Sequence, residues 1–371
     1  MKTLTFRFIQ IELMLVALML IGITSAFLIS PNALTQVVDG VRGIVGPEPI
    51  ALAETVYYGA TDTLQQNTST ASTPGFWSPP APSQVAPANI FSPRTVPPLY
   101  PALAAPGEGT WTPIPNSFNP SAAPLMYKTL LHPDATRPYA QVAIVALDAT
   151  RLRLRAVAGT KEPVSTASVP RPGLIPSSDV ASLVAAFNGG FRAIHGHYGM
   201  MVKGQALLPP LLNANTIALY RDGSMRIAPW SFISDTLPLM GSFRQTPAYL
   251  ALDGQTNPDL QNEQFSPWGK SVNGKIAISR SALGISADGR TLYYAAGESL
   301  TTQHLAEALL AAGASNVAEL DVNWSYQHLL TYAPRAGNPT EQVLLDAMVY
   351  QPGMYVTRPS ARDFFYLTLV K

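Results

Sequence analysis

Hydrophobic and polar residues alternate along the middle of the chain in the way that β-strands require. The stretch PYAQVAIVALDATRLRLRAVAG, residues 138–159, predicts two strands. In the second of them, Leu152 and Leu154 alternate with three arginines, so one face would be apolar and the other charged. A folded domain is therefore expected in this part of the chain.

Two segments with helical patterns lie among further strand patterns. SSDVASLVAAFNGGF predicts a helix that begins at Ser177 or Ser178 and leads into a buried segment ending at Asn-Gly-Gly. TTQHLAEALLAAG has three leucines at helical spacing, a threonine at its start and Gly313 at its C-terminus, which predicts the clearest helix of the chain.

The remaining patterns favour strands over helices. AYLALDGQ, GKIAISRSALGIS and TLYYAAGESL each predict strands around turns. Because many strands and few helices occur without regular βαβ alternation, the fold class predicted for residues 125–371 is α+β, a mixed and sheet-rich domain with a few helices.

The first thirty residues predict a membrane-targeting segment. Lys2 and Arg7 precede a largely apolar run that is long enough to cross a bilayer. This arrangement indicates a transmembrane signal anchor with a cytoplasmic N-terminus, and the rest of the chain would lie outside the cytoplasm, at the cell surface or in the periplasm. The alternative is a signal peptide, since Thr24 and Ala26 suit a cleavage site, and the protein would then be secreted.

Two segments separate this N-terminal run from the predicted domain. Residues 31–60 are expected to form a juxtamembrane segment. Residues 61–124 are rich in Pro, Ser and Ala, and such a composition buries too little apolar surface to order itself. We therefore expect a disordered linker, either a stalk that holds the domain away from a membrane or a passive spacer.

Composition and charge exclude several classes of function. The chain has 371 residues, a formal net charge of +1 and no cysteine. A near-neutral chain without a basic patch is not expected to bind nucleic acid. The absence of cysteine excludes thiol nucleophiles, thiolate metal sites and disulfides. No cofactor is indicated, and the sequence does not set the oligomeric state.

The stretch NVAELDVNWSYQ, residues 316–327, predicts a strand that carries two carboxylates on one face. Glu319 and Asp321 are two residues apart, so their Cα atoms would lie about 6.5 to 7 Å from each other. That spacing suits acid and base chemistry. The alternatives are that Glu319 is a solvated edge residue and that Asp321 makes a structural hydrogen bond to a turn.

Three stretches, AAFNGGFRAIHGHYGMMVKGQ, SRSALGISADGRTLYYAAGESLTTQHLAEALLAAG and VAELDVNWSYQ, resemble the phosphodiester glycosidase family in order and spacing. That family has bacterial relatives linked to exopolysaccharide biosynthesis. The resemblance covers roughly residues 139–371. It implies a sheet-rich fold and hydrolysis of a sugar-1-phosphodiester.

The family pattern matches this chain at some positions and departs from it at others. The first motif agrees at Asn188, Gly189, Gly190 and Phe191, while Arg192 stands where an aromatic residue is usual. The second carries over Arg280. The third is normally Leu-Asp-Gly-Gly-Gly-Ser-Ser, and here Leu320, Asp321 and Ser325 agree while Val322, Asn323 and Trp324 replace the glycines. Because Val322 tolerates positive φ poorly, the loop is expected to have another shape and ligand, or to have lost the chemistry.

Hydrolysis of a sugar-phosphate diester needs a proton donor, an activated water or nucleophile, and cations or amides around the phosphate. We expect Asp321 to be the nucleophile or base, and Glu319 to be the acid if burial raises its pKa. Arg280 would hold the phosphate, or else form an internal salt bridge to one of the carboxylates. Asn188 and the two glycine amides after it would face an oxyanion, or simply form the turn after a buried strand.

Further residues near these motifs are expected to bind substrate. His195 and His197 would face one way on a strand and, with Arg192, donate hydrogen bonds to phosphate in preference to binding a metal. Trp324 and Tyr326 offer flat faces for a sugar ring. The predicted substrate-binding residues are Arg280, Gly189, Gly190, Arg192, His195, His197, Asn323, Trp324 and Ser325.

These patterns lead to a hypothesis and two alternatives. The hypothesis is a membrane-tethered hydrolase that acts on a glycan or sugar phosphate outside the cytoplasm. The first alternative is a non-catalytic glycan-binding or polymer-assembly protein that keeps the fold and has lost the glycine loop. The second is a purely structural surface domain, which a mutual pairing of Arg280 and Asp321 would favour.

Overall fold

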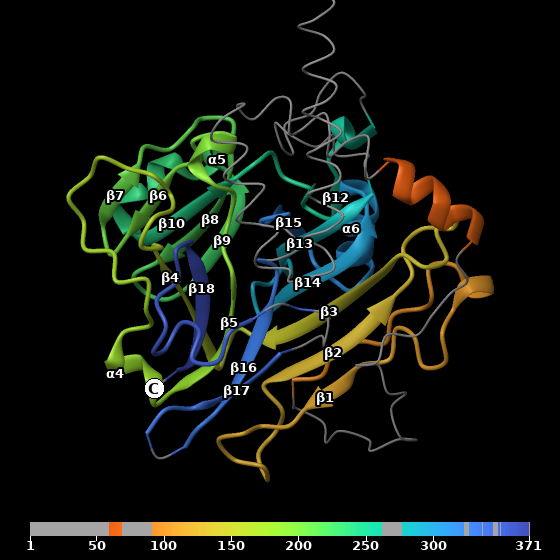
Figure 1. Cartoon of the computed structure of the whole chain (residues 1–371), viewed down its shortest axis with the longest axis horizontal. Coiled ribbons are helices and arrows are strands. Elements are labelled where there is room, and N and C mark those ends of the chain that lie inside the picture. Colours follow the sequence, from red (N-terminus) through yellow and green to blue (C-terminus); the bar gives the residue numbers. More distant parts are fainter. Residues whose placement is uncertain are drawn as a thin grey trace, which may run out of the picture.

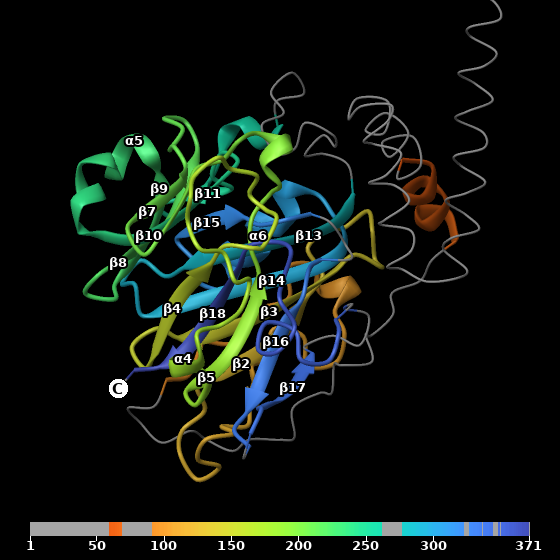
Figure 2. The ribbon, with the colours of Figure 1, turned by 60° about the vertical axis from the view of Figure 1, so that its left-hand side comes forward.

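The computed structural model describes residues 59–68, 91–261, 277–322, 326–335, 337–343, 348 and 350–370. Within them, three antiparallel sheets make up most of the molecule, and the helices are few and short (Figures 1 and 2). The predicted sheet-rich α+β class is confirmed.

The largest sheet has eight strands in the order β1-β2-β3-β14-β13-β15-β11-β12. Its strands are β1 (Thr112–Ile114), β2 (Met126–Leu131), β3 (Gln141–Asp148), β11 (Ala251–Leu252), β12 (Gln255–Thr256), β13 (Ile278–Ile285), β14 (Thr291–Leu300) and β15 (Asn316–Glu319). The strand patterns of the sequence correctly predicted its long central strands β3, β13 and β14.

Two five-stranded sheets complete the body. One has the order β17-β16-β5-β18-β4 and comprises β4 (Leu152–Val157), β5 (Leu183–Asn188), β16 (Leu329–Ala333), β17 (Thr340–Val343) and β18 (Phe364–Leu369). The other has the order β7-β6-β10-β8-β9 and comprises β6 (Met200–Val202), β7 (Gln205–Leu208), β8 (Asn215–Tyr220), β9 (Met225–Pro229) and β10 (Met240–Thr246).

The helical elements connect and cover the sheets. They are η1 (Pro101–Leu103), α4 (Ser177–Val180), η2 (Ala193–His195), α5 (Trp230–Ile233), η3 (Ser234–Leu239), η4 (Pro258–Gln261), α6 (Thr302–Ala311) and a helix over residues 59–68. The predicted long helix is confirmed as α6, where the Thr301 side chain caps the His304 amide and Gly313 follows with φ 108°. The helix expected at Ser177 has only four residues, because the fully buried strand β5 follows it closely.

Strand alternation produces two cores, one on each face of the eight-stranded sheet. Leu283 and Ile285 of β13 face the sheet that contains β5, where they join Phe187 and Phe365. Ala282 faces the opposite way and joins Leu305 and Leu309 of α6 among others. Asn188, at the end of β5, therefore lies where the two layers meet, whereas Arg280 and Glu319 lie on the face of Ala282.

The expectation of a disordered linker over residues 61–124 is wrong for residues 91–124. Val96 and Trp111 are buried, and β1 pairs with β2. Glu108 accepts the His132 amide at 2.9 Å and lies 2.7 Å from the His132 ring nitrogen Nδ1. Although this segment is rich in proline, its apolar side chains are buried in the domain and its polar groups are hydrogen-bonded to it. The folded body therefore begins about 35 residues earlier than expected.

The predicted membrane-targeting segment, residues 1–30, lies outside the described residues. So does most of the juxtamembrane segment, and so do residues 69–90 of the linker. In the described part of the chain, none of the helices combines the length and the apolar character that a bilayer crossing requires.

Candidate functional site

Asn188 is the last residue of β5, and its side chain is held in place by the neighbouring sheet. Its amide nitrogen Nδ2 donates to the Ser281 hydroxyl of β13 at 3.0 Å, and its Oδ1 accepts from the Tyr294 hydroxyl of β14 at 2.9 Å. Asn188 is fully buried. Its polar atoms are satisfied by the protein, so it acts here as a link between two sheets.

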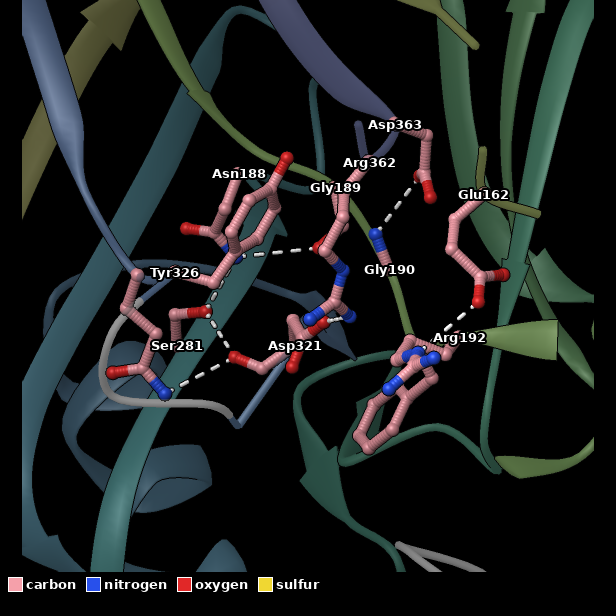
Figure 3. Close-up of polar contacts among 12 residues, drawn as sticks. Glu162, Asn188, Gly189, Gly190, Arg192, Ser281, Asp321, Tyr326, Arg362 and Asp363 are labelled. Atoms are coloured by element: carbon pink, nitrogen blue, oxygen red, sulfur yellow. Dashed lines mark hydrogen bonds and ion pairs between the residues drawn. The ribbon is translucent and has the colours of Figure 1, made fainter. Parts of the chain in front are cut away.

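Asp321 meets Asn188 and Ser281 just beyond the end of β15. Its backbone amide donates to the Gly189 carbonyl at 3.1 Å, and its own carbonyl accepts from Ser281 Oγ at 2.9 Å and from Gln327 Nε2 at 3.1 Å. Figure 3 shows Asn188, Gly189, Ser281 and Asp321 close together. Three segments that are far apart in the sequence therefore converge there.

The Asp321 carboxylate forms a close ion pair with Arg362, which lies two residues before the start of β18. The guanidinium carbon of Arg362 lies 4.5 Å from the centre of the Tyr326 ring, a cation–π arrangement. The tyrosine hydroxyl lies 2.6 Å from Ser360 Oγ. A fixed cation beside a carboxylate favours its charged form.

Glu319 is fully buried and pairs with Arg280, so the alternative that it is a solvated edge residue is wrong. The two groups approach to 2.6 Å between Glu319 Oε1 and Arg280 Nη1. Burial raises the pKa of Glu319 to about 7, and Arg280 keeps it from rising further. Oε2 of Glu319 is buried without a hydrogen-bond partner among the described residues.

Arg280 lies near the start of β13 and not at its end, because the strand continues to Ile285. Its Nε donates to the Leu300 carbonyl at 2.8 Å, and its side chain is fully buried. Of the two interpretations that the sequence left open, the structure contains the internal salt bridge. Arg280 pairs with Glu319 and not with Asp321. The Arg280–Asp321 pair that would favour a purely structural domain is therefore absent.

The two glycine amides after Asn188 point at Asp363. The Gly189 amide donates to the Asp363 carbonyl and the Gly190 amide to Asp363 Oδ2, both at 3.0 Å. The same carboxylate binds Arg244 of β10, with 2.9 Å between Oδ2 and the guanidinium Nε. The turn interpretation therefore describes this segment, and its amides are not directed at an oxyanion.

Arg192 and the two histidines are arranged differently from the prediction. Arg192 Nε lies 3.0 Å from Glu162 Oε1, and the amide of Ala193 donates to the other oxygen of that carboxylate at 3.0 Å. His195 ends the 3-10 helix η2, and His197 has φ 53°. The prediction that His195 and His197 face one way on a strand is therefore wrong.

The loop that replaces the glycine run is only partly described. Asn323, Trp324 and Ser325 lie outside the described residues. Val322 has no positive φ. The loop therefore begins without the left-handed backbone that glycines allow, as the substitution predicted.

Several residues at this point were not predicted from the sequence. Ser281 is adjacent to Arg280 but points to the opposite face of β13, toward Asn188. Arg362 and Asp363 are two oppositely charged neighbours in the sequence, directly before the largely apolar run FFYLTL. Charged residues directly before a buried strand indicate a candidate site in the same way as Glu319 and Asp321 at the end of a strand. In the described part of the chain, no group of three or more His, Cys, Asp or Glu residues is placed to hold a metal ion.

Comparison with family models gives no match, and comparison with curated proteins gives none either. The chain is similar in structure to the pro-peptide-inhibited catalytic domain of zebrafish N-acetylglucosamine-1-phosphodiester alpha-N-acetylglucosaminidase, with 13% identity and a TM-score of 0.44 over 68% of this chain and 85% of that chain. It is also similar to a hypothetical protein from Synechocystis, with 12% identity and a TM-score of 0.41 over 68% and 65% of the two chains. These are low-identity likenesses of fold.

Proposed function

We propose that this protein is an extracytoplasmic glycosidase that hydrolyses a sugar-1-phosphodiester linkage in an envelope or exopolysaccharide glycan. The observation that carries the proposal is the meeting of Asn188, Ser281 and Asp321, which come from three distant segments. The Asn188 and Ser281 side chains meet there with the backbone amide and carbonyl of Asp321, and burying polar groups from separate segments is a cost that folds accept at functional sites.

The two carboxylates have the different environments that acid and base chemistry needs. Burial raises the pKa of Glu319 to about 7, so near neutral pH a large fraction of this group carries a proton. Asp321 lies against the Arg362 cation, which favours a carboxylate. Pairs of acids whose environments separate their protonation states are typical of glycosidases.

These environments assign a role to each carboxylate. Glu319 would give its proton to the phosphate oxygen that leaves the anomeric carbon. Asp321 would attack that carbon or take a proton from the attacking water. The C–O bond breaks, the phosphate departs with the Glu319 proton, and water completes the sugar hydroxyl. Asn188 would fix the position of Asp321 through Ser281 and Gly189.

The location of the protein is part of the proposal. The apolar run within residues 1–30 would tether the chain to a membrane or be removed after export, and either outcome leaves the domain outside the cytoplasm. Envelope and exopolysaccharide glycans are the polymers found there. The substrate is therefore proposed to be a surface glycan that contains sugar-1-phosphate esters.

The test is release of free sugar from a synthetic sugar-1-phosphodiester by the purified chain. We expect Asp321→Asn and Glu319→Gln each to lower kcat by about 100-fold or more, because general acid or base groups contribute about 10² to 10⁴. Glu298→Gln, at an exposed position of β14, is the matched control and should keep full activity. Unchanged turnover in either site variant would remove that carboxylate from the mechanism.

A second candidate function is glycan binding without turnover. It is favoured by the pairing of both carboxylates with arginines, Glu319 with Arg280 and Asp321 with Arg362, which neutralises them in the resting structure. Binding of surface glycan by the purified chain, with no product detected by mass spectrometry, would support this candidate over hydrolysis.

A further inference from the structure

Arg362 is the more accessible partner of the Asp321 ion pair. Its side chain is 11% exposed, whereas that of Asp321 is 4% exposed. A buried ion pair loses much of its Coulomb energy to desolvation, so a competing anion with similar geometry can replace one partner at moderate cost. The pair is therefore a place where an incoming anion could exchange with a protein carboxylate.

Contacts that do not involve Asp321 hold Arg362 in position. Its guanidinium lies 4.5 Å from the Tyr326 ring centre. Its backbone carbonyl accepts from Ser360 Oγ at 2.7 Å, and its amide donates to the same oxygen at 3.1 Å. The Ser360 hydroxyl also lies 2.6 Å from the Tyr326 hydroxyl, so the ring and the arginine are fixed to the same residue. The cation would thus stay in place when its carboxylate partner changes.

Two other arginines of this region, Arg280 and Arg244, are fully buried, and Arg244 is held much more extensively than Arg362. Arg244 is fully buried and bonds to both oxygens of Asp363 and to the carbonyls of Phe191, Tyr198 and Gln245. Removing its carboxylate would break a network that also fixes the Gly190 amide. Arg244 is therefore structural, and Arg362 is the cation suited to exchange.

We propose that Arg362 is an anion-binding residue whose resting partner is Asp321, and that the phosphate of the substrate displaces this carboxylate. The inference rests on the proposed function for the identity of the anion. The guanidinium fork can donate two parallel N–H···O bonds to a carboxylate or to a phosphate, so a phosphate can take the place of the carboxylate. Displacement would also release Asp321 from its counter-ion at the moment when the substrate is bound.

The test measures binding of inorganic phosphate by calorimetry. Because Asp321 competes for the same guanidinium, Asp321→Asn should bind phosphate about tenfold more tightly than the unmodified chain. Adding Arg362→Gln to that variant should abolish the gain. The matched controls are Asp179→Asn and Arg155→Gln, which remove the partners of an ion pair 3.6 Å long elsewhere on the surface and should change nothing.

A second measurement does not depend on the folding of any variant. Phenylglyoxal modifies accessible arginines, and its reaction at Arg362 of the unmodified chain can be followed by mass spectrometry. Phosphate should slow labelling at Arg362 and leave Arg155, which is 49% exposed, unaffected. Equal phosphate affinity in a folded Asp321→Asn variant, or labelling of Arg362 that phosphate does not slow, would overturn the inference.

The two proposals fail in different ways. If the unmodified chain releases no sugar while Asp321→Asn binds phosphate more tightly, the glycosidase function is excluded and the anion exchange is retained. Loss of hydrolysis in Asp321→Asn alone agrees with both proposals. An active enzyme whose Asp321→Asn variant binds phosphate no more tightly would instead retain the function and exclude the exchange. A phosphate signal that persists after Arg362→Gln would identify another cation as the anion site.

Discussion

At the scale of single residues, the protonation of Glu319 is the property on which acid chemistry depends. The carboxyl is fully buried, and burial raises its pKa to about 7 although Arg280 acts in the opposite direction. An ordinary exposed glutamate would be almost fully ionised at that pH. Removal of water from this carboxyl group therefore lets it carry a proton near neutral pH, as the proposed acid role requires.

This protonation predicts the pH dependence of hydrolysis. Because the proposed mechanism requires the acid form of Glu319, kcat/KM should fall as pH rises through about 7, about tenfold for each further unit. A pH profile of the unmodified chain checks this decline. Glu319→Gln should give a low rate with no alkaline decline near pH 7, and a decline that persists in this variant would assign it to a different group.

At the scale of elements, the helix over residues 59–68 is attached to the domain mainly through Asp62. Its carboxylate binds the Arg137 guanidinium with contacts of 2.6 and 2.8 Å, and the Tyr139 hydroxyl donates to it at 2.8 Å. Burial opposes ionisation, yet the bonds from Arg137 and Tyr139 lower the pKa of Asp62 below its usual value. A segment that was expected to be linker is thus held against the β2–β3 connection.

Asp62→Asn should loosen this helix without unfolding the domain. Hydrogen bonds to charged groups contribute about 1.5 to 3 kcal/mol, so amide exchange within residues 59–68 should become at least about tenfold faster. Hydrogen-exchange mass spectrometry checks the change. Asn67→Ala is the control, since Asn67 is exposed and its side chain donates within the same helix to the Thr63 carbonyl. If both variants exchange alike, Asp62 does not attach the helix.

Because the pKa of Asp62 is lowered in the folded state, the attachment of this helix should weaken as pH falls. A carboxylate whose pKa is lower in the folded than in the unfolded state stabilises the folded state at pH values above the unfolded pKa. This stabilisation is lost as pH falls through the folded pKa. The protection of amides within residues 59–68, relative to their intrinsic exchange rate at each pH, should therefore fall in acid before that of the rest of the domain.

At the scale of the whole molecule, the ion pair of Arg244 and Asp363 joins two of the sheets. Arg244 belongs to β10 of one five-stranded sheet, and Asp363 directly precedes β18 of the other. Both side chains are almost fully buried, at 0% and 2% exposure. The same carboxylate receives the Gly190 amide, so this pair also fixes the turn after Asn188.

Breaking this pair should destabilise the entire fold. Asp363→Asn leaves the Arg244 charge buried without its counter-ion, and such changes cost about 3 to 5 kcal/mol. Urea unfolding measures the loss. The double variant Arg244→Met with Asp363→Asn removes the charge as well and should recover part of that stability. A cost below about 1 kcal/mol in the single variant would show that the pair is not what joins the two sheets.

The sequence by itself determined the class of the fold and its strongest elements. Strand patterns are local, so the alternation of β4 and the short apolar runs of β3 and β14 could be identified without knowing which strands lie beside them. The capped helix α6 was predicted for the same reason. The prediction of a disordered linker was wrong for residues 91–124 because composition averages over a segment, whereas the burial of Trp111 and Glu108 depends on the strands around them.

Only the tertiary structure decided which charged groups meet. The sequence identified Glu319, Asp321, Arg280 and Asn188 as candidates, and it left the salt bridge and the turn as alternatives. It did not identify Arg362 or Asp363, which lie more than 40 residues from Asp321 along the chain and come together only through strand order. Pairing of charges is set by distances across sheets, and these do not follow from the spacing of residues within one strand.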